Sequence, residues 1–201
     1  MPRSMLSVLV ALALAAVTST PAAAEPEVSA SLVDLADSPK DFRLDKDLRK
    51  NKQAVSAGEA SDISSATFAI TGAGETAVLE ARINVARLMG KKHAYNQAVG
   101  LYGYNFQYIV KSDGTASLNT YRKKHPTCAQ ASHQRNRAMD VVTITMPFPC
   151  LATGQKEQVI DARTWIHRRP RGVTVGGDTT QRAVVDILAA QFTGVKDPLG
   201  W

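Results

Sequence analysis

The chain has 201 residues, with 24 Lys and Arg against 18 Asp and Glu, for a formal net charge of +6. With 44% apolar and 21% charged residues, the chain is long and apolar enough for one domain with a substantial core. The mild basic excess, without an RNA-recognition or helix-turn-helix pattern, argues against nucleic acid as the partner, and no motif calls for a cofactor.

The first 24 residues have the pattern of an export signal. Arg3 is followed by an uncharged apolar run from Leu6 to Val17, and Ala22 to Ala24 provide the small residues of a cleavage site. The run of 12 residues is shorter than the roughly 20 that a membrane-spanning helix needs. We therefore expect residues 1–24 to be a removed signal peptide and the mature protein to be periplasmic or secreted, with no transmembrane segment after cleavage.

After the signal, residues 25–62 are polar and predict a mobile N-terminal arm, and residues 63–201 predict a single domain. Residues 66–71 predict a strand, and residues 75–91 predict a helix with one apolar face. Alternation over 102–110 predicts a strand that returns over 115–122 through the Asp113–Gly114 turn.

Residues 139–146 and 158–167 predict two further strands, and residues 178–192 predict a second helix that begins at Asp178 and stops before Gly194. The resulting order is β-α-β-β-β-β-α. It predicts an α+β fold, an antiparallel sheet of about four to five strands with two helices packed on one face.

The predicted hairpin places several tyrosines on one face, if residues whose numbers sum to 227 lie opposite each other. That face contains Tyr102, Tyr104, Tyr108 and Tyr121. Exposed aromatic rings on a rigid sheet can bind sugar rings or apolar groups, so these residues are candidate binding residues. The alternative is that they form the core beneath the two helices.

Cys128 and Cys150 are the two cysteines of the chain, and in an oxidising compartment they predict one disulfide. A weaker alternative is a metal site, because His125, Cys128 and His133 follow an H-x2-C-x4-H spacing. That spacing matches no metal motif we can identify, and we expect no metal.

Two basic segments are candidate sites for an anionic ligand. Arg135 and Arg137 lie in the first segment, and Arg168 and Arg169 lie in the second. Guanidinium groups bind phosphate or carboxylate through paired hydrogen bonds, so the two segments would form an anion site if the fold brings them together. The alternative is two solvated loops.

The histidines allow a catalytic hypothesis. His133 and His167, with an acid such as Asp140 or Asp161, would provide acid–base catalysis in a small secreted hydrolase that acts on an anionic substrate. The spacing does not require this arrangement, and the G-x-S-x-G, H-E-x-x-H and S-x-x-K motifs are absent.

Together these features favour an exported, non-enzymatic binding or envelope accessory protein. Its ligand contacts would come from the aromatic sheet face or from the arginine-rich loops. The expected partner is an envelope or extracellular protein, or an anionic ligand. The histidine hydrolase is the alternative.

Overall fold

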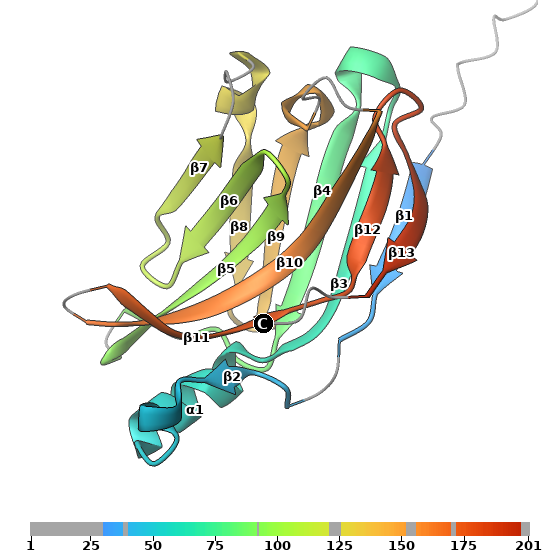
Figure 1. The fold of residues 1–201 in the computed structure, drawn as a ribbon. Helices are drawn as coiled ribbons and strands as arrows, with labels where there is room; N and C mark the ends of the chain where they lie inside the picture. Colours follow the sequence, from blue (N-terminus) through green and yellow to red (C-terminus); the bar gives the residue numbers. More distant parts are fainter. Residues whose placement is uncertain are drawn as a thin grey trace, which may run out of the picture.

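The computed structural model describes residues 30–37, 40–91, 93–120, 126–151, 156–169 and 172–197. These residues form two antiparallel sheets that face each other, with one α-helix at one end (Figure 1). The predicted α+β fold with two helices on one sheet is therefore wrong, and the fold is a mostly-β sandwich. The predicted signal peptide, Tyr121 and His125 lie outside the described residues.

The smaller sheet has five strands in the order β1-β3-β4-β9-β8. Their bounds are β1 Ala30–Leu35, β3 Ile63–Thr71, β4 Val78–Val85, β9 Val141–Pro147 and β8 Ser132–Asn136. The predicted strands 66–71 and 139–146 are present as β3 and β9.

The larger sheet has eight strands, six of them in the order β13-β12-β10-β5-β6-β7, while β11 pairs with both β10 and β2. The bounds are β13 Gln191–Lys196, β12 Arg182–Asp186, β10 Glu157–Arg168, β5 Tyr95–Gly103, β6 Phe106–Lys111, β7 Ala116–Thr120, β11 Val173–Thr179 and β2 Arg43–Leu44. The predicted strand 158–167 is present within β10, the long central strand of this sheet.

The helix expected over residues 75–91 is instead mainly strand β4. Leu79, Ala81, Ile83 and Val85 are buried, and the positions between them are more exposed. This period of two places the alternate apolar residues against the other sheet. The segment also contains residues with high helix propensity, but its pairing with β3 and β9 on both sides decides the outcome.

The second predicted helix, over 178–192, is also wrong. The segment contains the end of β11, all of β12 and the start of β13. The Asp186 carboxylate accepts hydrogen bonds from the backbone N–H groups of Leu188 and Ala189, and Ala190 adopts a positive φ of 50°. These features make a tight turn between two strands where the sequence suggested a continuous helix.

The predicted hairpin is confirmed in its position but not in its turn type or along its full length. Gly114 adopts a φ of 86° between β6 and β7, but Asp113 does not share this positive φ, so the loop is not the two-residue turn that the Asp-Gly pattern favours. The opposing residues sum to 226 rather than 227, so Tyr108 faces Leu118 instead of Asn119. The one-residue difference moves the partner strand's side chains to the opposite face of the sheet.

The first predicted strand of that hairpin is broken by a turn at Tyr104 and Asn105, which separates β5 from β6. Gly103 lies opposite Phe106 at this turn. A Cβ atom at Gly103 would lie only 2.2 Å from the Phe106 ring, so the turn needs a residue without a side chain. As a result, Tyr102 and Tyr108 belong to different strands.

The folded part begins before Ile63, although a mobile arm was predicted over 25–62. Strand β1 pairs with β3, and helix α1 (Lys52–Ser61) packs against β5, β10 and β11. The Asn51 side chain caps α1 by accepting hydrogen bonds from the N–H groups of Gln53 and Ala54. Small buried residues on α1, among them Ala54 and Ala57, let the helix approach the sheet closely.

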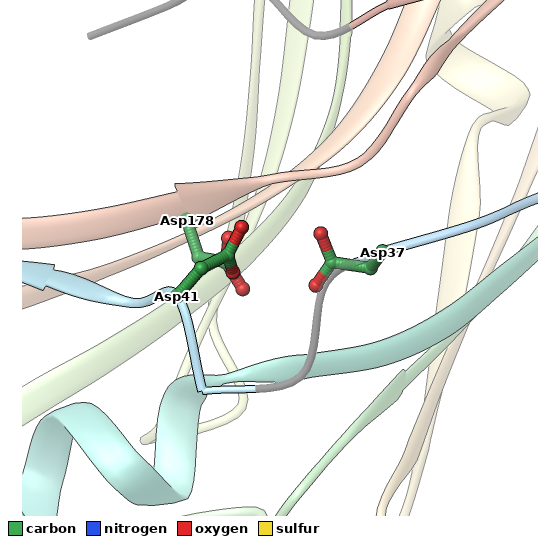
Figure 2. A group of neighbouring side chains, drawn as sticks. All are labelled: Asp37, Asp41 and Asp178. Carbon is green, nitrogen blue, oxygen red and sulfur yellow. The ribbon is translucent and has the colours of Figure 1, made fainter.

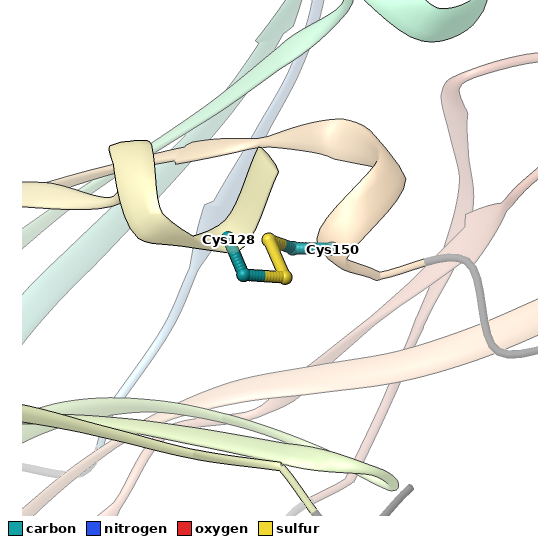
Figure 3. Close-up of a disulfide and its surroundings, with 2 residues drawn as sticks. All are labelled: Cys128 and Cys150. Atoms are coloured by element: carbon teal, nitrogen blue, oxygen red, sulfur yellow. A yellow bond between two sulfur atoms is a disulfide. The ribbon is translucent and has the colours of Figure 1, made fainter. Parts of the chain in front are cut away.

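The predicted disulfide joins Cys128 and Cys150, whose Cα atoms are 5.3 Å apart. The cysteines lie in two short 3-10 helices, η3 (Pro126–Gln130) and η4 (Phe148–Cys150), which Figure 3 shows side by side. An unpredicted strand, β8, folds back along β9 and brings them together. The chain also forms η1 (Lys46–Leu48) and η2 (Gly74–Thr76).

Candidate anion-binding site

Arg135 and Arg137 lie at the end of the sandwich opposite the disulfide. The Arg135 guanidinium donates to the carbonyl oxygens of Ser112, at 2.8 Å, and Met89, at 3.1 Å. Arg137 also donates to the Met89 carbonyl, at 3.4 Å. The two arginines therefore converge on one backbone oxygen and tie the end of β8 to the loop before β5.

Hydrogen bonds connect this pair to the second predicted arginine segment. Ser112, whose carbonyl accepts from Arg135, donates its hydroxyl to the Asn96 side-chain oxygen. The Arg169 Nε group donates to the same Asn96 oxygen, and Arg168 precedes Arg169 at the end of β10. The fold thus brings the two predicted arginine segments to one region, which the sequence left open.

Two lysines add positive charge to this region. They were not predicted from the sequence. The positive charges of Lys111 and Lys91 both act on Asp113 and lower its pKa, after the larger effect of its hydrogen bonds with Thr115. The positive charge of Lys111 also lowers the pKa of His167, after the larger effect of burial. Lys111 therefore lies near the end of β10 that carries His167. We call the resulting surface the basic end; its residues are Lys91, Lys111, Arg135, Arg137, Arg168 and Arg169.

The cations of the basic end outnumber the nearby acids. Asp113 and Asp140 are the carboxylates in the turns at this end, and Asp140 is engaged by the Leu88 N–H. Within the described ranges, none of the six cations makes an ion pair. Partial burial, together with Arg137, lowers the pKa of Arg135 from its usual value. The negative charge of Asp113 acts in the opposite direction, and an anionic ligand that reached Arg135 would add to this favourable charge.

A pocket of about 320 Å³ adjoins the basic end. It is lined by Met89, the residue that binds both arginines, and by the cationic side chains of Lys52 and Arg87. His93 lines the same pocket and is exposed. The pocket therefore extends the positive surface from β8 towards helix α1.

The structure does not bring the two predicted catalytic histidines together. His133, on β8 of the small sheet, contacts the Tyr108 hydroxyl at 3.1 Å and the Gly114 carbonyl at 3.2 Å. His167, on β10 of the large sheet, contacts the Thr174 hydroxyl at 3.1 Å. Burial lowers the pKa of His167, which favours its neutral form. The geometry therefore gives no support to a His133–His167 acid–base pair.

The predicted tyrosine face is divided between the two sides of the large sheet. Tyr108 is buried in the core between the sheets. Tyr102 is partly exposed on the outer side, beside Trp165, and Tyr104 is exposed on the adjoining turn. Tyr102 and Tyr104 therefore lie on the outer side, whereas Tyr108 lies in the core, where the other sheet covers it instead of the two helices of the alternative interpretation.

The predicted metal alternative loses its sulfur ligand because Cys128 is oxidised in the disulfide. Of the two histidines in that pattern, His133 is engaged by Tyr108, and His125 lies outside the described residues. The structure thus supports the disulfide over a site that uses the Cys128 thiolate.

Three carboxylates, two of them close in sequence and the third far from both, form a separate cluster. Asp37, Asp41 and Asp178 have oxygens within 4.8 Å of one another, and Figure 2 shows Asp37 turned towards the other two. Asp178 is 3% exposed and accepts hydrogen bonds from the N–H groups of Ile63 and Thr179. Burial and the neighbouring Asp41 raise the pKa of Asp178 to about 6.

Because the pKa of Asp178 is raised in the folded protein, the free energy of unfolding depends on pH. Ionising Asp178 in the folded protein is unfavourable, so its stabilising contribution is complete below about pH 4 and is lost as the pH rises through 6. Asp41→Asn removes the like charge and is expected to raise the free energy of unfolding by roughly 0.5–1 kcal/mol above pH 6, with little effect at pH 4. Urea denaturation at pH 4 to 8 measures this difference.

Asp47→Asn is the matched control, because Asp47 is exposed on η1. It removes the same charge, and its effect should not change across this pH range. If the Asp41 and Asp47 variants respond alike to pH, the proposed coupling between Asp41 and Asp178 is wrong.

Comparisons of the chain with protein-family models, with curated proteins and with solved structures found no match. In the part of the chain that the structure describes, no helix has the length and apolar character needed to cross a membrane.

Proposed function

We propose that the chain is an exported, non-enzymatic binding protein that holds an anionic ligand at its basic end. The observation that carries this proposal is the convergence of Arg135 and Arg137 on the Met89 carbonyl, beside four further cations that make no ion pair within the described ranges. Positive groups that outnumber the nearby carboxylates favour a negatively charged partner.

The way the arginines are held also supports binding. Backbone carbonyls accept from Arg135 and Arg137 and orient both guanidinium groups without neutralising them. An incoming phosphate or carboxylate would therefore meet side chains that have already lost part of their conformational freedom. The exposed Arg168, Arg169 and Lys111 would add a wider field that attracts the ligand.

The export part of the proposal depends on residues 1–24. Their basic start, apolar run and small-residue site are the features of a secretory signal. The Cys128–Cys150 disulfide suits the oxidising compartments to which such signals lead.

Binding to polyphosphate tests the proposed function. The mature protein is expected to bind with an affinity that falls as salt rises from 50 to 200 mM. Arg168→Gln combined with Arg169→Gln removes two exposed charges and should weaken binding roughly tenfold at 50 mM salt, with a shallower salt dependence. Fluorescence anisotropy with labelled polyphosphate gives both values.

The control removes two exposed positive charges elsewhere, by Arg82→Gln on β4 and Lys196→Gln on β13. This variant has the same net charge as the first and should bind almost as well as the unmodified protein. Equal losses in the two variants would show that net charge alone attracts the polyanion, and the basic end would then not be its site.

A further inference from the structure

A groove of about 350 Å³ lies on the outer face of the large sheet, away from the basic end. Strand β10 supplies Glu157, Asp161 and Arg163, and β12 supplies Arg182. Tyr102 and Tyr104 line it from the end of β5 and the turn that follows. The tyrosines were predicted from the sequence as binding residues, whereas Asp161 was predicted only as a possible catalytic acid, and Glu157 and Arg182 were not predicted.

The polar groups of the groove are already positioned by contacts within the protein. Asp161 is 4% exposed and accepts two hydrogen bonds from Arg163, at 2.7 and 2.9 Å. The Arg163 guanidinium lies 4.6 Å from the centre of the Tyr102 ring. Arg182 donates from Nε to the Asp197 carbonyl, at 2.7 Å. The side chains therefore present a defined surface to a ligand.

The charges of the groove balance, unlike those of the basic end. Two arginines and two carboxylates line the groove, so a polyanion without sugar rings would gain little binding free energy there. Tyr104 is 68% exposed and offers an aromatic surface beside these planar polar groups. An aromatic ring together with carboxylate and guanidinium groups fits an uncharged, hydroxyl-rich ring, whose C–H face packs on the phenol and whose hydroxyls pair with the charged groups.

The groove and the basic end lie along one strand. On β10, Asp161, Arg163, Trp165 and His167 face the outer side, each opposite a residue of β5, and the strand ends at Arg168. Arg168 lies seven positions after Asp161, which corresponds to roughly 23 Å of extended strand. Figure 1 shows β10 crossing the large sheet, from beside β12 to the strand with which it pairs at its other end, β11.

We infer that the ligand is an anionic polysaccharide that lies along β10. Sugar rings occupy the groove beside Tyr104, and the negative substituents reach the basic end. This inference deepens the proposed function and depends on it, because the basic end supplies the charge recognition. A chain of phosphates without sugars would use the basic end alone.

Two kinds of probe separate the sites. Heparin and polygalacturonate are anionic polysaccharides, whereas polyphosphate has no sugar. Tyr104→Ala combined with Glu157→Gln alters the groove at two exposed positions and leaves the Asp161–Arg163 pair intact. We expect this variant to lose roughly fivefold or more in affinity for at least one polysaccharide and to bind polyphosphate as well as before.

The loss of the Glu157 charge separates binding of sugar rings from attraction by charge alone. Because Glu157→Gln removes a negative charge, a purely electrostatic surface would bind every polyanion more tightly after the change. The control variant, Leu32→Ala with Glu80→Gln, makes a similar change on the small sheet, where Leu32 and Glu80 are both exposed, and should not lower polysaccharide affinity. Circular dichroism of both variants checks that each is folded.

The outcomes distinguish the two proposals. If polyphosphate binds with the expected salt dependence and the groove variant keeps its full affinity for both polysaccharides, this inference is overturned and the basic-end function stands. If none of the three probes binds in a salt-dependent way, the proposed function itself fails.

Discussion

Gln97→Leu is expected to lower the free energy of unfolding by about 3 kcal/mol, because it leaves several buried backbone groups without partners. Gln97 is 1% exposed. Its side-chain oxygen accepts from the Met89 N–H, at 2.9 Å, and its amide donates to the carbonyls of Ala60 and Arg87 and to the Ser61 hydroxyl. One side chain thus joins the end of α1 to the loop that carries Met89.

Leucine has nearly the volume of glutamine and would fill the space, so the loss would come from hydrogen bonding rather than from a cavity. Urea denaturation measures the change. Gln134→Leu is the control, because Gln134 is exposed on β8, and its effect should stay within about 0.5 kcal/mol. Equal effects of the two variants would mean that the Gln97 network contributes nothing particular.

Replacing both cysteines with serine is expected to destabilise the protein by roughly 3 kcal/mol. The Cys128–Cys150 bond closes a loop with a sequence separation of 22, and removing it lets the unfolded chain reach more conformations. Both cysteines are buried, so the new hydroxyls would also be placed in apolar surroundings. The midpoint of urea unfolding should fall accordingly.

Chemical reduction provides the control for this result. Dithiothreitol should lower the stability of the unmodified protein by a similar amount and leave the double serine variant unchanged. A double variant as stable as the unmodified protein would show that the hairpin of β8 and β9 holds this end without the bond.

The sequence predicted those parts of the fold in which local pattern and tertiary structure agree. The alternation in β9 and β10 and the position of the Asp-Gly turn before β7 fall in this group. Strand β4 was missed because its apolar residues also fit one face of a helix, and only its two neighbouring strands decide between the periods. Strand β8 was missed because SHQRN is a polar edge strand without an apolar pattern.

The basic end was predicted only in part, because some of its residues reach it through strand pairing that the sequence does not reveal. Arg135, Arg137, Arg168 and Arg169 stand out as charge clusters in the sequence. Lys91 and Lys111 reach the basic end only through turns whose positions depend on strand pairing. Placing Tyr108 beside Tyr102 failed because the turn at Tyr104 starts a new strand, and a period-two pattern alone does not reveal such a break.

Strands β1 and β13, from opposite ends of the described chain, lie next to each other, and the Phe192 N–H donates to the Ser31 hydroxyl. The small sheet likewise joins β4 to β9, across the whole β5–β7 segment. Contacts between such distant residues form slowly, because long loops must close first. A ribosome-bound fragment without its last strands could pair β1 with β3 but would lack β13 beside β1, so this side of the sandwich would close only after β13 has been synthesised.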